Sequence, residues 1–305
     1  MMQSFYSNGK LLITGEYVVL DGANAFALPT KLGQHLDVEP ITDRNIIWTS
    51  FDEKGNLWFQ DTFNIETLTS VANNSEDPVS KQLTALLKTA KKENPDFLTH
   101  HSGYKVSTRL DFPRDWGLGS SSTLINNLAL WANVNPMTLL LHSFGGSGYD
   151  IACARHNAPI LYQVGDPPKI KEISFNPRFK DELFFVHRNK KQNSRDAIST
   201  YKQYKTNSEI IIQKINRITS QLLKADSRLI FDALIIEHEI LIAHVTNQTP
   251  IKNDLFPDFD NAIKSLGGWG GDFILVTGTK AYVYDYFNSK NYNTIIAYND
   301  LILGA

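Results

Sequence analysis

Residues 116–123 combine two glycines with four consecutive hydroxyl side chains, in the order Trp-Gly-Leu-Gly-Ser-Ser-Ser-Thr, and an apolar segment follows. Glycine permits positive φ angles and a close approach of the backbone to a ligand, and serine suits the N-cap and first turn of a helix. A helix N-terminus carries unpaired N–H groups and a partial positive charge, which together bind phosphate. The run therefore predicts a phosphate-binding loop that opens a helix, and an ordinary glycine turn with a serine cap is the structural alternative.

A single carboxylate stands out in the segment that follows. Between Trp116 and Gly165 the only formally charged residues are Asp150 and Arg155. A carboxylate in such apolar surroundings is costly to bury unless it is paired with a cation or has a functional role. We therefore predict that Asp150 acts as a base or orients a substrate hydroxyl, and a helix N-cap is the alternative.

Two further features could take part in phosphate chemistry. Lys10 stands at the start of the first apolar strand, where it could neutralise a phosphoryl group or hold Asp150 ionised. A solvated lysine is the alternative. Residues 267–271 contain four glycines in five positions, just before an apolar strand, which predicts a close approach of the backbone to a ligand or else a turn or bulge.

Several established motifs are missing from the sequence. It has no Walker phosphate loop, because no glycine is followed by lysine and then serine or threonine. The H-R-D and D-F-G motifs of protein kinases are also absent. Glu237, His238, Glu239 and His244 fall on one predicted helix. We interpret them as a solvated or lightly paired face, and a metal site is the alternative. If the protein transfers phosphate, it therefore belongs neither to the Walker-loop proteins nor to the protein kinases.

Length and composition fit a soluble chain of about two domains. The chain has 305 residues and a net charge of −2, which gives no electrostatic reason to expect nucleic acid. Its one cysteine, Cys153, rules out an internal disulfide, suits a reducing cytoplasm and lies in an apolar run typical of a core. No apolar run approaches the roughly 18 residues that span a bilayer. We expect a cytoplasmic protein with no membrane partner.

The first half should position these residues with a mixture of strands and helices. We expect strands over 5–14, 18–20, 25–28, within 34–63, over 104–110 and 159–164, and helices over 78–92, 123–133, 136–144 and from 149.

The second half shows the same mixture. We expect strands over 183–187 and 273–277, helices over 194–224, 227–245 and 259–266, and either type over 281–286. The proline pair at 167–168 is the best candidate for a domain boundary. Because strands and helices do not alternate regularly, the fold class is α+β.

Three ordered segments resemble the motifs of the GHMP small-molecule kinases: residues 9–20, 117–122 and 268–272. Residues 147–152 resemble the segment that carries the family's catalytic aspartate. Gly15-Glu16-Tyr17 and the Gly-Gly-Asp of the third motif look most like phosphomevalonate kinases, since mevalonate kinases usually have histidine in place of Tyr17.

The resemblance implies two α+β lobes with the site in the cleft between them. Residues 1–166 would form an ATP-binding lobe like the second domain of ribosomal protein S5, and residues 167–305 a ferredoxin-like lobe. Lys10 and Asp150 would be catalytic, and Mg²⁺ would lie near Ser121. The implied ATP-binding residues are Gly117, Leu118, Gly119, Ser120, Ser121 and Ser122, and the implied substrate-binding residues are Glu16, Tyr17, Gly270 and Gly271.

The sequence departs from the family at two places. Asn8 stands where the family usually has proline, and residues 133–142 lack the glutamate that binds metal in relatives such as mevalonate kinase. Mg²⁺ usually keeps several waters and few protein ligands, so this loss is compatible with metal binding. Residues 189–194 occupy the place of a substrate segment, and their lysines could bind an anion or form an ordinary polar loop.

The leading hypothesis is an ATP-dependent kinase that phosphorylates mevalonate or phosphomevalonate, a small anionic acceptor with a hydroxyl or phosphate group. A sugar or homoserine kinase of the same fold is one alternative. A non-catalytic nucleotide- or metabolite-binding protein on this scaffold is another. The sequence is compatible with a monomer or a homodimer.

Overall fold

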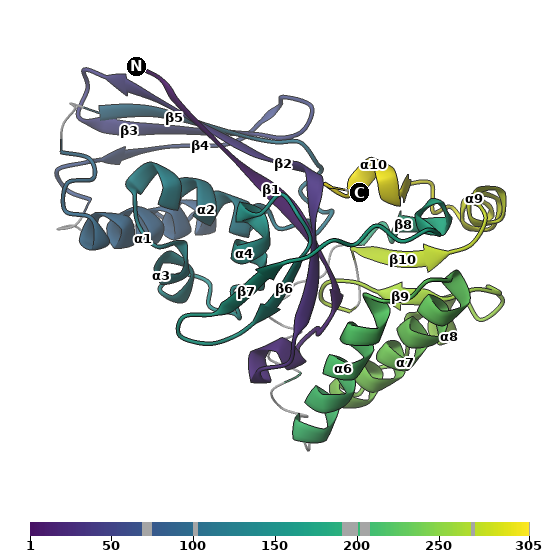
Figure 1. Ribbon diagram of the computed structural model, residues 1–305. Coiled ribbons are helices and arrows are strands. Elements are labelled where there is room, and N and C mark those ends of the chain that lie inside the picture. The colour runs from purple at the N-terminus through teal and green to yellow at the C-terminus, as the bar shows by residue number, and fades with distance from the viewer. Residues whose placement is uncertain (69–74, 100–102, 191–200, 202–207, 270–271, 305) are drawn as a thin grey trace. The chain divides into compact units, whose positions relative to one another are not determined.

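The computed structural model describes residues 1–68, 75–99, 103–190, 201, 208–269 and 272–304 (Figure 1). The chain forms two compact units that interleave along the sequence. The first comprises residues 1–9, 32–114 and 118–155, and the second comprises residues 10–31, 115–117 and 156–305. The domain division after residue 166 stays a prediction.

Two long strands belong to both units. Strand β1 (Gln3–Thr14) begins in the first unit and ends in the second, and β2 (Ala25–Ile41) leads back to the first. The short helix η1 (Val18–Asp21) lies between them. Among the described residues the strands form two sheets, so the chain has a mixed α/β structure.

The first unit packs helices on one face of a sheet (Figure 1). The strand order is β4 (Leu57–Asn64), β3 (Asn45–Phe51), β5 (Gly103–Leu110), β2, with β3 parallel to β5 and the other pairs antiparallel. Its helices are α1 (Pro78–Glu93), α2 (Ser120–Ala132), α3 (Pro136–Leu141) and α4 (Tyr149–Arg155). Alternate residues of β3 are buried, and Trp48 packs into a core with Leu86 and Leu128.

The second unit contains an antiparallel sheet of order β11 (Ile295–Ala297), β8 (Leu183–His187), β10 (Phe273–Thr277), β9 (Ile263–Ser265). Strand β6 (Ile160–Gln163) pairs with residues 25–27 of β2 and with β7 (Lys169–Glu172). Five helices complete this unit's described part, with η2 (Lys180–Glu182): α6 (Ser208–Leu222), α7 (Arg228–Thr246), α8 (Ile251–Leu255), α9 (Lys280–Ser289) and α10 (Tyr298–Leu301). None of the described helices is long and apolar enough to cross a bilayer.

Most predicted elements are confirmed, and two are wrong. Residues 18–20 form η1 instead of a strand, because the backbone turns sharply at Tyr17. Residues 259–266 are not a helix, and Ile263–Ser265 form the edge strand β9. A short apolar run can form either a helix or a strand, and here the pairing with β10 makes it a strand. Of the helix predicted over 194–224, residues 208–222 form α6, and most of its first half lies outside the described residues.

Candidate functional site

The glycine-serine loop has the backbone that its sequence predicts. Gly117 and Gly119 have φ angles of 65° and 94°, and α2 begins at Ser120. The N-cap is Gly119 instead of a serine, and no side chain caps the helix. By contrast, Asp77, Asn135 and Thr279 cap α1, α3 and α9 with side-chain oxygens. The first-turn N–H groups of α2 are thus left open to an external acceptor.

The hydroxyl groups of this turn point in different directions. Ser122 is buried, and its Oγ donates back to the Gly119 carbonyl oxygen over 2.8 Å. Thr123 is also buried, and its Oγ1 donates to Gln34 Oε1 over 2.7 Å. Ser121 is exposed. The turn therefore presents Ser121 outward and uses Ser122 and Thr123 to hold the loop and helix in place.

Two buried amides anchor α2 inside the first unit. Asn126 Nδ2 donates to Ser7 Oγ over 2.8 Å, and Asn127 Nδ2 donates to the Gln34 carbonyl oxygen over 2.8 Å. Ser7 Oγ in turn donates to Asn127 Oδ1 over 2.7 Å. The helix below the loop is therefore fixed to β1 and β2 by polar contacts that its sequence did not suggest.

Lys10 lies against the first residue of the loop. Its Nζ donates to the Gly117 carbonyl oxygen over 2.9 Å, and the side chain is buried. Both residues belong to the second unit. This hydrogen bond puts Lys10, one of the two predicted catalytic residues, beside the predicted phosphate loop. An ammonium in this position suits a phosphate ligand.

Asp272, the last residue of the third motif, is a neighbour of the loop that the sequence did not place there. A Cβ atom placed on Gly117 would lie 2.3 Å from Asp272 Cγ, so the carboxylate packs directly on the glycine. Asp272 N donates to the Lys190 carbonyl oxygen over 2.6 Å, and Arg188 N donates to the Asp272 carbonyl oxygen over 2.8 Å. These bonds extend the pairing of β8 and β10 and hold Asp272 in place.

Asp150 is the second residue of α4 and is half-buried. Its Oδ1 accepts from Ile151 N over 3.0 Å, and it stands in the first turn of the helix, where a negative charge is favourable. Asp150 belongs to the first unit and Lys10 to the second. Their meeting at an acceptor hydroxyl stays a prediction.

Glu16 lies inside the second unit, with 1% of its surface exposed. It forms an ion pair with the fully buried Lys264 of β9. Lys264 Nζ also donates to the Ser265 carbonyl oxygen over 2.8 Å and lies 3.5 Å from Glu239 Oε1 of α7. The ammonium thus joins the turn after β1, helix α7 and the strand that leads into the second glycine-rich stretch.

His238 and Glu239 complete this buried cluster. Gly15 N donates to His238 Nε2 over 3.1 Å, so Nε2 is unprotonated and the ring is neutral. Burial lowers the pKa of His238 well below its usual value. Burial also raises the pKa of Glu16, and it raises that of Glu239 to about 7 despite the opposing effect of Lys264.

The prediction of a solvated face was wrong for His238 and Glu239, which are both buried. Glu237 is the exposed acid of the run, and it pairs with Arg217 of α6. The error arose because the sequence does not show which side of α7 packs against β9 and the turn at residues 15–17.

Tyr17 occupies a strained turn. Its φ and ψ angles are 63° and −52°, and Val18 N donates to the Glu16 carbonyl oxygen over 2.7 Å, which is a γ-turn of the rare kind. The ring stacks on Tyr201 at 5.5 Å between centroids. The buried Tyr17 hydroxyl has no hydrogen-bond partner among the described residues. Strain and an unsatisfied donor are both typical of functional positions.

Some predicted residues lie outside the described part of the chain. These are Gly270 and Gly271 of the second glycine-rich stretch, and residues 191–194 of the predicted substrate segment. Their roles stay predictions.

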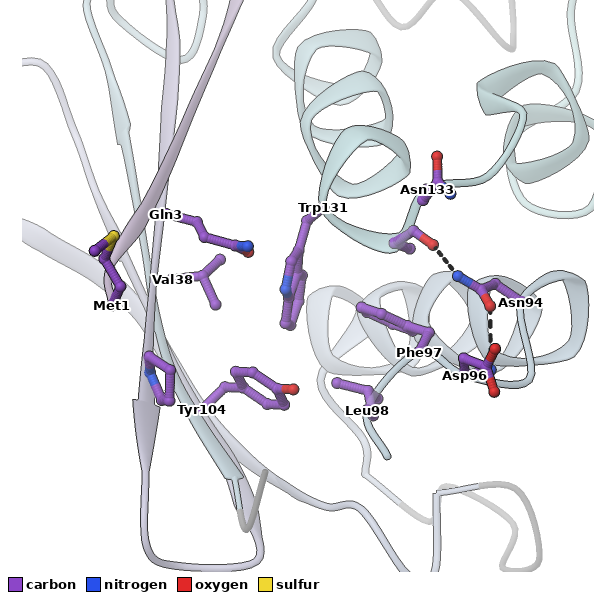
Figure 2. A pocket seen from close by; sticks show the side chains of 12 residues that line it. Met1, Gln3, Val38, Asn94, Asp96, Phe97, Leu98, Tyr104, Trp131 and Asn133 are labelled. Carbon is purple, nitrogen blue, oxygen red and sulfur yellow. Dashed lines mark hydrogen bonds between the residues drawn. The ribbon is translucent and has the colours of Figure 1, made fainter. Parts of the chain in front are cut away.

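A cavity of about 490 Å³ lies in the first unit, toward the C-terminal end of α2 (Figure 2). Trp131, Phe97 and Tyr104 supply aromatic walls, and Gln3 and Asp96 lie among its polar lining residues. It contains none of the predicted site residues. The described lining has no cationic side chain, which makes the cavity a poor match for phosphate.

Comparisons with known proteins identify the fold. No protein-family model matches the sequence, and no curated protein matches it either. A Methanococcus jannaschii mevalonate kinase structure matches with a TM-score of 0.73 and 15% identity, over 97% of this chain and 96% of that one.

Two further solved structures match over nearly their full length. A Streptococcus pneumoniae phosphomevalonate kinase in complex with phosphomevalonate and AMPPNP has a TM-score of 0.71 and 15% identity, over 97% of this chain and 98% of that one. A Lactococcus lactis galactokinase complexed with galactose has a TM-score of 0.72 and 12% identity, over 100% and 94%. The chain therefore has the fold of the GHMP kinases that its motifs resemble.

Proposed function

We propose that the chain is an ATP-dependent GHMP-type kinase that transfers a phosphoryl group to mevalonate or phosphomevalonate. The observation that carries the proposal is the uncapped N-terminus of α2, which follows two glycines of positive φ. Lys10 bonded to Gly117 and the shared kinase fold add support. The finer architecture, with an S5-like lobe, a ferredoxin-like lobe and a site in the cleft between them, belongs to the same proposal.

In this proposal the reaction needs positioning and charge stabilisation more than covalent chemistry. Backbone N–H groups of residues 119–122 hold the β- and γ-phosphates of ATP. Lys10 stabilises the charge that develops on the transferred group. Asp150 orients or deprotonates the acceptor hydroxyl. Glu16 and Tyr17 shape the acceptor site, with Tyr17 as the direct contact because its hydroxyl lacks a partner among the described residues.

Mg²⁺ would be held with few protein ligands. The described residues contain no group of three or more His, Cys, Asp or Glu side chains that could hold a metal ion. The exposed Ser121 hydroxyl, phosphate oxygens and water form a donor set that suits this ion. When bound, Mg²⁺ would neutralise phosphate charge.

Two other functions remain as alternatives. A sugar or homoserine kinase would use the same loop, and a galactokinase shares the fold. A non-catalytic nucleotide- or metabolite-binding protein is favoured by the absence of a carboxylate over residues 133–142. We place the kinase in the cytoplasm, on a route of isoprenoid synthesis.

An ATP-consumption assay with mevalonate, phosphomevalonate, homoserine and galactose tests the proposal. We expect turnover with mevalonate or phosphomevalonate and none with galactose. Turnover with galactose or homoserine alone would establish one of the alternative kinases. ATP binding without turnover of any acceptor would favour the binding protein.

A further inference from the structure

A polar cluster sealed from water includes Glu16, the residue that precedes Tyr17. Its charged members are Glu16, Lys264 and Glu239, which are 1%, 0% and 3% exposed. Lys264 Nζ donates to Glu16 Oε1, to the Ser265 carbonyl oxygen over 2.8 Å and to Glu239 Oε1 over 3.5 Å. An ammonium group has three hydrogens, and these contacts use all of them. Lys264 is therefore saturated by the protein itself and is not a cation for a ligand.

The same cluster holds the backbone of the turn. Gly15 N donates to Nε2 of His238 on α7 over 3.1 Å, and Glu16 Oε2 lies 3.3 Å from that nitrogen. The side chain of Glu16 is bonded to β9 through Lys264. The two residues that lead into the strained backbone of Tyr17 are thus fixed from α7 and from β9, and a change in the cluster would reach Tyr17 directly.

The described cluster contains one more acid than base. Glu16 and Glu239 face a single ammonium group, that of Lys264. His238 does not supply a second positive charge, because its Nε2 accepts the hydrogen bond from Gly15 N. Two ionised carboxylates would therefore leave a net negative charge out of contact with water, which is costly. One of the two carboxyl groups consequently keeps a proton, and the two acids share it around one ammonium group.

Burial is the main reason that the cluster holds this proton near neutral pH. Burial raises the pKa of Glu239 to about 7, Lys264 opposes the rise, and the charge of Glu16 adds to it. Lys264 and Glu16 are the charged groups that face Glu239 from β9 and from the turn, among the described residues. Helix α6 contributes only an uncharged hydroxyl to this region, that of Thr219, which is bonded to Thr14 over 2.7 Å. The proton is therefore lost within a pH range that includes physiological values.

We propose that Glu239 is a positioning residue for the acceptor: the proton that it shares with Glu16 keeps the turn at residues 15–17 in place, and loss of this proton weakens acceptor binding. The inference rests on the proposed function, in which Tyr17 contacts the acceptor. Glu239 touches no substrate and acts through Lys264 and Glu16. When both carboxylates are ionised, they compete for one ammonium group and repel each other, so the turn shifts. ATP binding should not change, because the phosphate loop supplies none of these groups.

A second measurement follows the turn itself and needs no acceptor. The Gly15 amide hydrogen is bonded to His238, the neighbour of Glu239 on α7. Its nuclear magnetic resonance signal in the isotope-labelled intact chain should therefore shift around pH 7 in the wild type and in Glu237→Gln. The signal should stay in place in Glu239→Gln, because the amide does not titrate. A wild-type signal that does not shift, or a shift that Glu239→Gln retains, would overturn the inference.

The main test is the dissociation constant of mevalonate and of phosphomevalonate, measured by calorimetry on the intact chain with a non-hydrolysable ATP analogue present. From about pH 6 to about pH 8.5 we expect the wild-type acceptor Kd to rise at least about fivefold, the lower end of typical coupling between two sites. Glu239→Gln should keep the low Kd throughout, because the amide leaves the cluster neutral. Glu237→Gln, with an exposed acid on the same helix, is the control and should rise like the wild type.

The acceptor's own ionisation affects all three proteins alike, and a merely structural role of Glu239 would change Kd equally at every pH. A wild-type Kd that stays flat, or a rise that persists in Glu239→Gln, would overturn the positioning role while leaving the kinase proposal intact if the acceptor is turned over. The expected pattern of binding without turnover would support the positioning role and overturn the kinase proposal. No binding of either acceptor would overturn both.

Discussion

At the scale of single residues, position 117 requires glycine for two separate reasons. Its φ angle of 65° disfavours any other residue, and a Cβ atom would overlap the Asp272 carboxylate. We expect Gly117→Ala to weaken ATP binding by at least about tenfold, because strain and displacement of the carboxylate both disturb the loop. Titration with a fluorescent ATP analogue measures this.

Gly55→Ala is the matched control for that experiment. Gly55 also has positive φ, at 81°, but a Cβ atom there would meet nothing within 4 Å. It should lower stability slightly and leave nucleotide affinity unchanged. Equal nucleotide affinities for Gly117→Ala and the wild type would show that the loop does not hold ATP.

Asp150→Asn tests the proposed role of the carboxylate. The amide keeps the size of the side chain but cannot accept a proton, so turnover should fall by about 10²- to 10⁴-fold. ATP affinity should stay the same, since the loop is unaltered. Near-normal turnover in this variant would remove Asp150 from the reaction.

At the scale of elements, the buried cluster of Glu16, Lys264 and Glu239 links pH to stability. The folded pKa of Glu239, about 7, lies above the value of an unfolded chain. Its contribution to stability is therefore complete below the unfolded pKa and is lost as the pH rises through about 7. Urea unfolding at a series of pH values should show this loss in the wild type.

Glu239→Gln should flatten that part of the pH profile, because the amide does not titrate. Glu237→Gln is the control on the same helix, since Glu237 is exposed and pairs only at the surface. A wild-type profile that keeps its slope in Glu239→Gln would place the titrating group elsewhere.

Removing the ammonium of the cluster should be severe. Lys264→Met leaves Glu16 buried without its partner and should destabilise the fold by about 3–5 kcal/mol. The double variant Glu16→Gln/Lys264→Met should regain part of this, because it leaves no charge unpaired at that position. Denaturant unfolding gives both values, and a single variant as stable as the wild type would contradict the ion pair's assigned role.

Elements were predictable where local chemistry decides them. Asp77 and Pro78 predict the start of α1, and in the structure Asp77 Oδ1 accepts a hydrogen bond from Val79 N over 2.7 Å. The short strand β9 was missed because its pairing with β10 carries no local signal. The contact between Glu16 and Lys264 joins residues 248 positions apart, so no sequence pattern could indicate it.

At the scale of the whole molecule, a shared fold does not imply a shared acceptor. Structures that share this fold at 12% to 15% identity include kinases of mevalonate, phosphomevalonate and galactose. The three motifs were enough to predict the fold. The first contains the sharp turn at Tyr17, the second contains the start of α2, and part of the third lies outside the described residues. We predict that Glu16 and Tyr17 contact the acceptor, and the predicted contacts Gly270 and Gly271 lie outside the described residues. The fold does not select the acceptor, because structures with different acceptors share it.

The most direct test of the central claim is a crystal structure of the chain with a non-hydrolysable ATP analogue. We expect the triphosphate to lie within hydrogen-bond distance of the backbone N–H groups of residues 119–122, with Lys10 beside it and the Asp150 carboxylate facing the γ-phosphate. A triphosphate bound away from this loop, or an Asp150 carboxylate turned away from the γ-phosphate, would contradict it.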